Sequence, residues 1–174
     1  MTQIFPEPDS AIVLRPAGMQ DIDALLDILN RAADKLLAKG IQQWVSPRKA
    51  EPIRRAIESG EQFLATVAGQ VVAVFKLSGQ SSNPAVEAAQ PGNLYLSQLA
   101  VHPEKQNQGV GKRVMKQILQ DAAALGKTLY LDCWAGNHTL KAFYQSCGLE
   151  SLGDIPEEDY FITIFKAPQH GRVD

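Results

Sequence analysis

Apolar residues recur along the chain with two different periods, and these predict helices and strands in alternation. Helical spacing predicts four helices, over 19–39, 46–59, 112–125 and 139–147. Gly40 suits the C-terminal cap of the first helix. Ser46 and Pro47 suit the start of the second, because a serine hydroxyl caps a helix and proline fits its first turn.

Short apolar segments that read as strands lie before, between and after these helices. They are predicted over 12–15, 62–67, 71–77, 93–101, 128–134 and 160–166, and the end of the chain accommodates one or two closing strands. A tight turn around Gly69 joins two of them as an antiparallel hairpin, which excludes a purely parallel sheet. We therefore predict one α/β domain over 1–174, with a mixed sheet in a core of about 12–166.

Composition and charge exclude several classes of function. The 174 residues include 17 Lys and Arg against 19 Asp and Glu, a net charge of −2, whereas nucleic-acid-binding proteins normally carry a basic patch. No apolar run approaches the ~20 residues of a membrane span, and residues 1–9 do not resemble a signal peptide. Cys133 and Cys147 lack the spacing of a metal site. We expect a cytoplasmic protein with two free thiols and without a metal, nucleic-acid or membrane partner.

One short segment has the pattern of a phosphate-binding turn. Gln106-Asn107-Gln108-Gly109-Val110-Gly111 follows a predicted strand and precedes a predicted helix. The first N–H groups of a helix have no partner inside it, and with the helix dipole they favour an anion. Gly109 and Gly111 lack the Cβ atoms that would keep an anion from the backbone. Lys112 and Arg113 add positive charge for the remaining phosphate oxygens.

Two common nucleotide-binding patterns do not fit this segment. A Walker A loop requires glycine where the chain has Gln106, and serine or threonine where it has Arg113. A Rossmann loop requires glycine at the position of Val114. Both kinds of nucleotide-binding module are therefore excluded.

A third pattern does fit, and it resembles the signature of a known family. Gln106, Gly109 and Gly111 match Gln/Arg-x-x-Gly-x-Gly/Ala, which is similar to the acetyl-CoA signature of the GNAT superfamily of N-acetyltransferases. The family's second signature, an Asn followed by a helix with Tyr and then Gly, is resembled by Asn137, Phe143, Tyr144, Cys147, Gly148 and Leu149. The resemblance covers roughly positions 12–166, and the order of the predicted elements agrees with it throughout.

The resemblance implies a fold and a cofactor. The fold is a mixed, mostly antiparallel central sheet with helices on both faces and a splayed strand pair, here the strands ending at Val101 and Trp134. The pantetheine arm of acetyl-CoA would lie in the gap and pair with the backbone of Leu99, Ala100 and Val101. The pyrophosphate would be wrapped by Gln106, Asn107, Gln108, Gly109, Val110, Gly111 and Lys112.

Acetyl transfer from a thioester to an amine needs a proton donor for the departing thiolate. The resemblance implies this role for Tyr144, since a phenol with an ordinary pKa of about 10 keeps its proton at neutral pH. The alternative is that Tyr144 only packs its ring in the core.

The proton acceptor for the amine departs from the usual pattern. Many relatives carry a glutamate in the strand before the phosphate loop, where this chain has Tyr95 and Ser97. Alternation along the strand places Asp132 on one face with Tyr130 and Trp134, and a carboxylate in the middle of a central strand is unusual. Relatives that acetylate protein N-termini have an acidic residue at this place. We predict that Asp132 is the base, directly or through a water; the alternative is a structural carboxylate bonded to nearby backbone or to a tyrosine hydroxyl.

Three further side chains are candidates for contacts with cofactor or acceptor. Asn137 either binds the cofactor arm or caps the helix that follows it. Trp44 and Trp134 are candidates for the acceptor pocket, and the alternative for Trp44 is a partly buried clamp between two helices.

Together these features predict an N-acetyltransferase. It would move the acetyl group of acetyl-CoA directly to a primary amine of a small molecule, peptide or protein in a ternary complex. The alternative is a non-catalytic acyl-CoA-binding regulatory protein on the same fold, which Tyr144 opposes and the missing strand glutamate favours. The sequence does not identify the acceptor, and it leaves a homodimer open.

Overall fold

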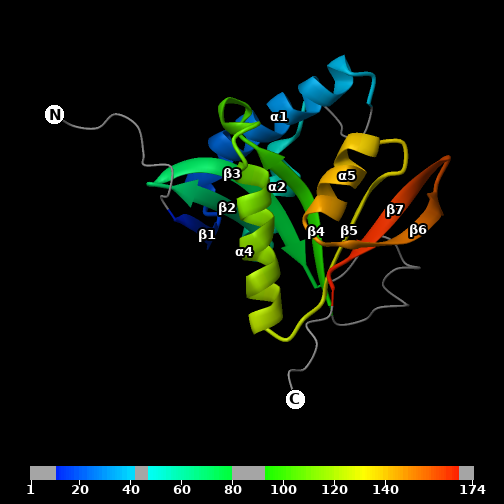
Figure 1. The fold of residues 1–174 in the computed structure, drawn as a ribbon. Coiled ribbons are helices and arrows are strands. Elements are labelled where there is room, and N and C mark those ends of the chain that lie inside the picture. The colour runs from blue at the N-terminus through cyan, green and yellow to red at the C-terminus, as the bar shows by residue number, and fades with distance from the viewer. Residues whose placement is uncertain (1–10, 42–46, 80–92, 169–174) are drawn as a thin grey trace. The chain divides into compact units, whose positions relative to one another are not determined.

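The computed structural model describes residues 11–41, 47–79 and 93–168 (Figure 1). These residues divide into two compact units. The first unit takes its described residues from Met1–Lys76 and Gln98–Gln117, and the second takes them from Leu77–Ser97 and Ile118–Asp174. Strand β4 (Leu94–Val101) and helix α4 (Val110–Ala124) each contribute residues to both units. The single domain over 1–174 stays a prediction.

Seven strands in the described residues follow the hydrogen-bonded order β1-β2-β3-β4-β5-β7-β6. Besides β4 they are β1 (Ile12–Pro16), β2 (Gln62–Val67), β3 (Gln70–Ser78), β5 (Leu129–Trp134), β6 (Glu150–Glu157) and β7 (Tyr160–Lys166). The pairs β1–β2, β2–β3, β5–β7 and β6–β7 are antiparallel, and β4–β5 is parallel. The predicted mixed, mostly antiparallel sheet is confirmed.

Besides α4, the described helices are α1 (Ile22–Ala38), α2 (Ala50–Glu58) and α5 (His138–Ser146), with short 3₁₀ turns η1 (Met19–Asp21) and η2 (Pro103–Lys105). None of these described helices is long and apolar enough to cross a membrane. As predicted, Gly40 follows the end of α1 with a left-handed φ of +77°.

The first unit packs α1 and α2 on its strands. Leu25 and Leu29 of α1 and Ile53 of α2 are buried in one apolar cluster with Leu64 of β2 and Val74 of β3. Burying each such side chain contributes about 1.5–3 kcal/mol. The helical spacing of apolar residues therefore has its physical basis in this cluster.

The hairpin of β2 and β3 turns at Ala68 and Gly69, which both have positive φ, +51° and +78°. Two consecutive left-handed residues match the twist of antiparallel strands, so the turn predicted around Gly69 is confirmed. Inside the hairpin, the buried Gln62 side chain donates a hydrogen bond to the Phe75 carbonyl at 2.9 Å. This bond satisfies a polar group that would otherwise be costly to bury.

The predicted start of the second helix is wrong. Helix α2 begins at Ala50, whereas Pro47 is not helical and Ser46 lies outside the described residues. The Arg48 N–H instead donates to the Asn30 side chain of α1 at 2.7 Å. This bond holds the residues just before α2 in a non-helical conformation. Pro52 occupies the first turn of α2, where its missing N–H costs no hydrogen bond.

In the second unit, β6 and β7 close the sheet, in agreement with the one or two closing strands predicted at the end of the chain. Strand β6 is weakly apolar, because it lies at the edge of the sheet and most of its side chains are exposed. Gly153, with φ of +101°, and Pro156 are tolerated there, since an edge strand needs hydrogen bonds on one side only. Asp154 accepts a hydrogen bond from the Thr163 hydroxyl of β7 at 2.5 Å.

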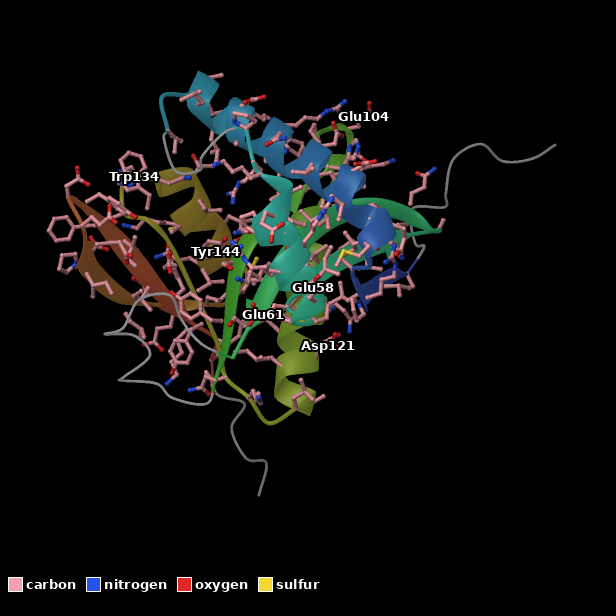
Figure 2. The ribbon with its side chains drawn as sticks, turned by 180° about the vertical axis from the view of Figure 1, so that it is seen from behind. Glu58, Glu61, Glu104, Asp121, Trp134 and Tyr144 are labelled. Atoms are coloured by element: carbon pink, nitrogen blue, oxygen red, sulfur yellow. The ribbon has the colours of Figure 1, made fainter. Side chains whose placement is uncertain are left out.

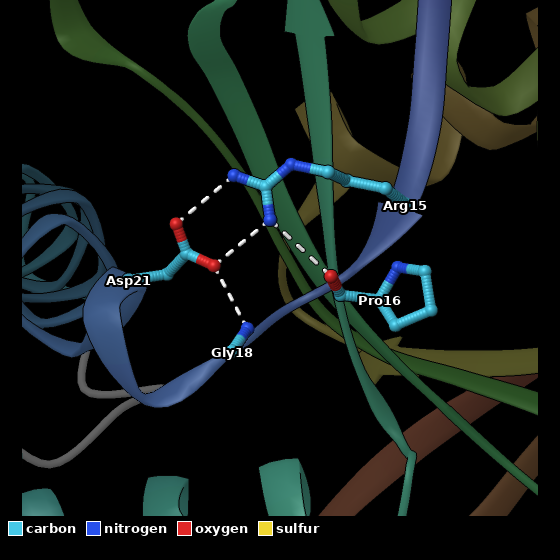
Figure 3. Close-up of polar contacts among 4 residues, drawn as sticks. All are labelled: Arg15, Pro16, Gly18 and Asp21. Carbon is cyan, nitrogen blue, oxygen red and sulfur yellow. Dashed lines mark hydrogen bonds and ion pairs between the residues drawn. The ribbon is translucent and has the colours of Figure 1, made fainter.

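A bidentate ion pair holds the segment between β1 and α1 (Figure 3). The Arg15 guanidinium donates to both carboxylate oxygens of Asp21, at 2.8 and 3.0 Å, and the Gly18 N–H donates to the same carboxylate at 2.8 Å. These bonds lower the pKa of Asp21 from its ordinary value, the Arg15 hydrogen bonds being the main cause and burial opposing them. Asp21 therefore stabilises the fold above pH 3.8, and this contribution is lost as pH falls through the lowered pKa.

We expect Asp21→Asn to lower the free energy of unfolding at pH 7 by about 1–2 kcal/mol, a charge-assisted hydrogen bond discounted for solvent screening. The discount follows because the Arg15 side chain is 39% exposed. In urea titrations the difference from wild type should begin to shrink below pH 3.8, and it should be smallest below the lowered pKa of Asp21, where this carboxyl is neutral in both the folded and the unfolded state. The control is Asp27→Asn, which breaks an exposed pair with Arg31 inside α1 and should change stability by under about 0.5 kcal/mol. Equal losses in the two variants would contradict the assignment.

Candidate functional site

The candidate residues fall into one group in each unit. Residues 99–101 and 106–112 belong to the first unit, whereas Asp132, Trp134, Asn137 and Tyr144 belong to the second. Trp44 lies outside the described residues, so its acceptor role stays a prediction.

The turn before α4 has the backbone of an anion-binding loop. Asn107 and Gly109 both have positive φ, +62° and +76°. Helix α4 begins at Val110, two residues earlier than predicted, so Gly111 belongs to its first turn. The Arg113 N–H donates to the Gly109 carbonyl at 3.2 Å as the first helical bond. The N–H groups of the preceding first-turn residues are therefore the ones available to an anion.

The backbone at Gly109 is not crowded by neighbouring atoms. A Cβ built on Gly109 meets no atom within 4 Å, so its surroundings are open. Lys112, in the first turn of the helix, is exposed and carries positive charge. Backbone donors, open space and a cation together match the chemistry of a pyrophosphate.

Hydrogen bonds of its two glutamine side chains hold this turn in place. Gln106 donates from Nε2 to the Val101 carbonyl at 3.2 Å, and its Oε1 accepts a hydrogen bond from Lys35 of α1. Gln108 donates to the Glu104 carbonyl at 3.0 Å; Figure 2 labels Glu104 beside α1. Lys35 is 71 residues from Gln106 in sequence, so no local pattern could have indicated this contact.

Strand β4 contains a conformation that the sequence did not predict. Gln98, inside the strand, has a left-handed φ of +56°. The parallel pairing with β5 covers Leu94–Leu96 and ends before this residue, so Gln98 separates the paired part of β4 from the part with Leu99, Ala100 and Val101. Glycine or asparagine would have signalled such a conformation, but glutamine does not.

In the second unit, Tyr144 lies on α5 as predicted (Figure 2). Its ring is tilted against Phe165 of β7 at a centroid distance of 5.5 Å and against Phe143 at 5.4 Å. Tyr144 is 6% exposed, and this burial raises the pKa of its phenol above the ordinary value of 10. The phenol therefore keeps its proton at neutral pH, whether the ring only packs or also acts as an acid.

Asp132 occupies the other face of β5. Antiparallel pairing sets Leu131 opposite Phe165 and Asp132 opposite Ile164, and neighbouring residues of a strand point to opposite faces. Tyr144 packs on the Phe165 face, so it and Asp132 lie on opposite sides of the strand.

The Asp132 carboxylate is partly buried and has a defined partner. The Tyr95 hydroxyl of β4 donates a hydrogen bond to its Oδ2. Burial raises the pKa of Asp132 from its ordinary value of 3.8; the Tyr95 bond opposes the shift and the negative charge of Glu157 adds to it. The direction of the net shift is the one that prepares a carboxylate to accept a proton near neutral pH.

The neighbouring residues of β5 and α5 have structural roles that the contacts define. Asn137 caps α5, because its Oδ1 accepts the Leu140 N–H at 3.1 Å; binding of the cofactor arm stays a prediction. The Trp134 ring lies over Gly136, since a Cβ built there would approach ring atoms to 2.5 Å. Burial raises the pKa of the Cys133 thiol to about 11, so it stays protonated and is a poor nucleophile.

Comparison with known proteins identifies the family of this chain. Residues 23–149 match the model of the acetyltransferase (GNAT) family. The chain belongs to this family. It is also 29% identical to the uncharacterized N-acetyltransferase YesJ of Bacillus subtilis over 146 residues, 79% of this chain and 81% of that protein.

Solved GNAT structures have the same fold. A GNAT acetyltransferase of Streptococcus agalactiae superposes with a TM-score of 0.77 at 15% identity, covering 91% of this chain and 96% of its own. The yncA protein of Salmonella typhimurium, whose structure contains its cofactor acetyl-CoA, gives 0.67 at 17% identity and covers 94% and 98%. The chain is thus an acetyl-CoA-dependent GNAT acetyltransferase, which confirms the predicted family, fold class, enzyme class and cofactor.

Proposed function

We propose that this GNAT enzyme acetylates a primary amine, with Asp132 taking the proton of the amine and Tyr144 supplying a proton to the departing sulfur. The observation that carries the proposal is the Asp132 carboxylate, partly buried on a central strand and held by the Tyr95 hydroxyl. A carboxylate in that environment costs free energy to bury, and a proton acceptor is what an amine substrate requires. The similarity to YesJ, an uncharacterized N-acetyltransferase, supports an amine acceptor.

Acetyl-CoA supplies the thioester, and the turn at 106–112 holds its pyrophosphate. The left-handed residues Asn107 and Gly109 lead into the first turn of α4, whose free N–H groups and dipole favour the negative charge. Leu99, Ala100 and Val101 bind the pantetheine arm through their backbone. The Val101 carbonyl accepts a hydrogen bond from Gln106, which ties this segment to the turn.

The two proton-transfer groups suit different halves of the reaction. The raised pKa of Tyr144 keeps its proton on the phenol throughout the neutral range, so it hydrogen-bonds to sulfur as negative charge develops there. Asp132 needs its anionic form to accept a proton, and the Tyr95 hydrogen bond stabilises that form. Trp134, the last residue of β5, lines the acceptor site.

We expect Gly109→Glu to abolish acetyl-CoA binding in calorimetric titrations, because the side chain places bulk and negative charge at the pyrophosphate site. Gly126→Glu is a matched control, since Gly109 and Gly126 have similar φ, +76° and +67°, and a Cβ meets no atom within 4 Å at either. Both variants carry the same backbone strain, and the control should bind acetyl-CoA like wild type. Unchanged affinity in folded Gly109→Glu would refute the placement of the pyrophosphate.

We expect Tyr144→Phe to reduce kcat by roughly 10²–10⁴-fold, the usual contribution of a positioned acid. The ring contacts with Phe143 and Phe165 remain, so thermal stability and acetyl-CoA affinity should barely change. Tyr160→Phe, which removes an exposed phenol of the same unit, should leave kcat unchanged. Wild-type turnover in Tyr144→Phe would return this residue to a packing role.

We expect Asp132→Asn to lower kcat/KM near neutral pH, and the loss should shrink as pH approaches the pKa of the acceptor amine. That pKa is about 10.4 for a lysine-like amine and about 7.7–8.0 for an α-amino group, so the pH of recovery also reports the acceptor class. Asp154→Asn is the control, because it too neutralises a carboxylate held by a hydroxyl, that of Thr163. A pH–rate profile parallel to wild type would rule out the base role, and reduced stability with unchanged kinetics would indicate a structural carboxylate.

A further inference from the structure

Parallel strands β4 and β5 bring a tyrosine to the proposed base. Tyr95 is in register with Tyr130, so the two side chains share a face of the sheet with Asp132, two residues further along β5. The Tyr95 hydroxyl donates to Oδ2 of Asp132. The bond joins residues 37 apart in sequence, and it uses one carboxylate oxygen.

The tyrosine ring is held rigidly. Tyr95 is 7% exposed and packs in an apolar cluster with Tyr130 of β5 and Ile162 and Ile164 of β7. The ring therefore cannot turn its hydroxyl away from Asp132 without opening the cluster. A donor that is fixed by packing can also fix the orientation of the carboxylate it binds.

We propose that Tyr95 is a positioning residue for acetyl transfer: it holds Oδ2 of Asp132 and thereby aims Oδ1 at the acceptor amine. The inference rests on the proposed role of Asp132 as base. As the amine nitrogen bonds to the acetyl carbon, the carbon–sulfur bond breaks and sulfur leaves with the electron pair. The proton lost by nitrogen goes to Oδ1, directly or through one water, and sulfur receives a proton from Tyr144.

A positioning role has an electrostatic signature that a purely structural role lacks. Burial and Glu157 raise the pKa of Asp132, whereas the Tyr95 hydrogen bond lowers it. Asp132 interacts with titratable groups of five elements, namely Tyr95 of β4, Cys133 of β5, Tyr144 of α5, Glu157 of β6 and Tyr160 of β7. Lys166 of β7 lies over the Tyr130 ring on the same face. Among these groups Tyr95 is the one that donates a hydrogen bond to the carboxylate.

The test is Tyr95→Phe, which keeps the packed ring and removes the hydroxyl. The Asp132 carboxyl is followed by carbon-13 NMR during a pH titration, a readout that requires no acceptor. We expect its titration to move upward by about 1 pH unit or more, since a hydrogen bond to a charged group is lost. The ascending limb of kcat/KM against pH should move by the same amount.

Tyr130→Phe is the matched control. It removes a phenol hydroxyl from the same cluster, at the position paired with Tyr95, and it leaves in place the Tyr95 hydroxyl that donates to Asp132. The midpoint of the Asp132 titration should be the same as in wild type. A second control places Tyr95→Phe in the Asp132→Asn background, where it should cause no further loss of kcat/KM if Tyr95 acts through Asp132.

If Tyr95→Phe does not fold, 3-fluorotyrosine at position 95 tests the same point with the opposite sign. Its more acidic phenol is a stronger donor, so the Asp132 titration should move downward. The positioning role would be overturned if folded Tyr95→Phe left both the Asp132 titration and the ascending limb of kcat/KM unchanged. If Asp132→Asn were still impaired, the base role would remain intact. A wild-type profile in Asp132→Asn would instead overturn the proposed function.

Discussion

Pairing of Leu94–Leu96 with Leu129–Leu131 is the constraint on which the proposed chemistry depends. It places the Tyr95 hydroxyl at Asp132, so that a carboxylate on a central strand has a partner and its burial is tolerated. The pairing ends before Gln98, whose left-handed φ lets the rest of β4 continue to the phosphate turn without the same register. One strand thus contains the partner of the proposed base and leads to the proposed cofactor loop.

Burial acts in one direction on three acidic groups of the second unit, with a different chemical result for each. It raises the pKa of the Tyr144 phenol, which secures the proton that an acid must hold. It raises the pKa of Asp132 toward the range of a useful base, while the Tyr95 hydrogen bond limits the shift. It raises the pKa of Cys133 to about 11, so this buried thiol stays protonated at neutral pH.

The turn that we propose to hold the pyrophosphate differs from these groups, because the donors it offers are backbone N–H groups. Asn107 and Gly109 adopt left-handed conformations, and α4 begins directly after them, so the helix N-terminus is presented by local geometry. Lys35 and Val101 then hold the Gln106 side chain from two other elements. The backbone conformation of the proposed anion site is therefore set by local sequence, whereas the contacts that hold the Gln106 side chain are tertiary.

The sequence by itself determined the features whose physics is local: the glycine-containing turn before α4, the Gly69 hairpin, the helical faces and the alternation that sets Asp132 apart from Leu131. These follow from backbone freedom and side-chain period, which neighbouring residues decide. Only the tertiary structure decided the Tyr95–Asp132 and Lys35–Gln106 contacts, which join residues 37 and 71 apart. It also decided the edge strand β6 and the late start of α2, because sheet position and the Asn30–Arg48 bond outweigh local propensity there.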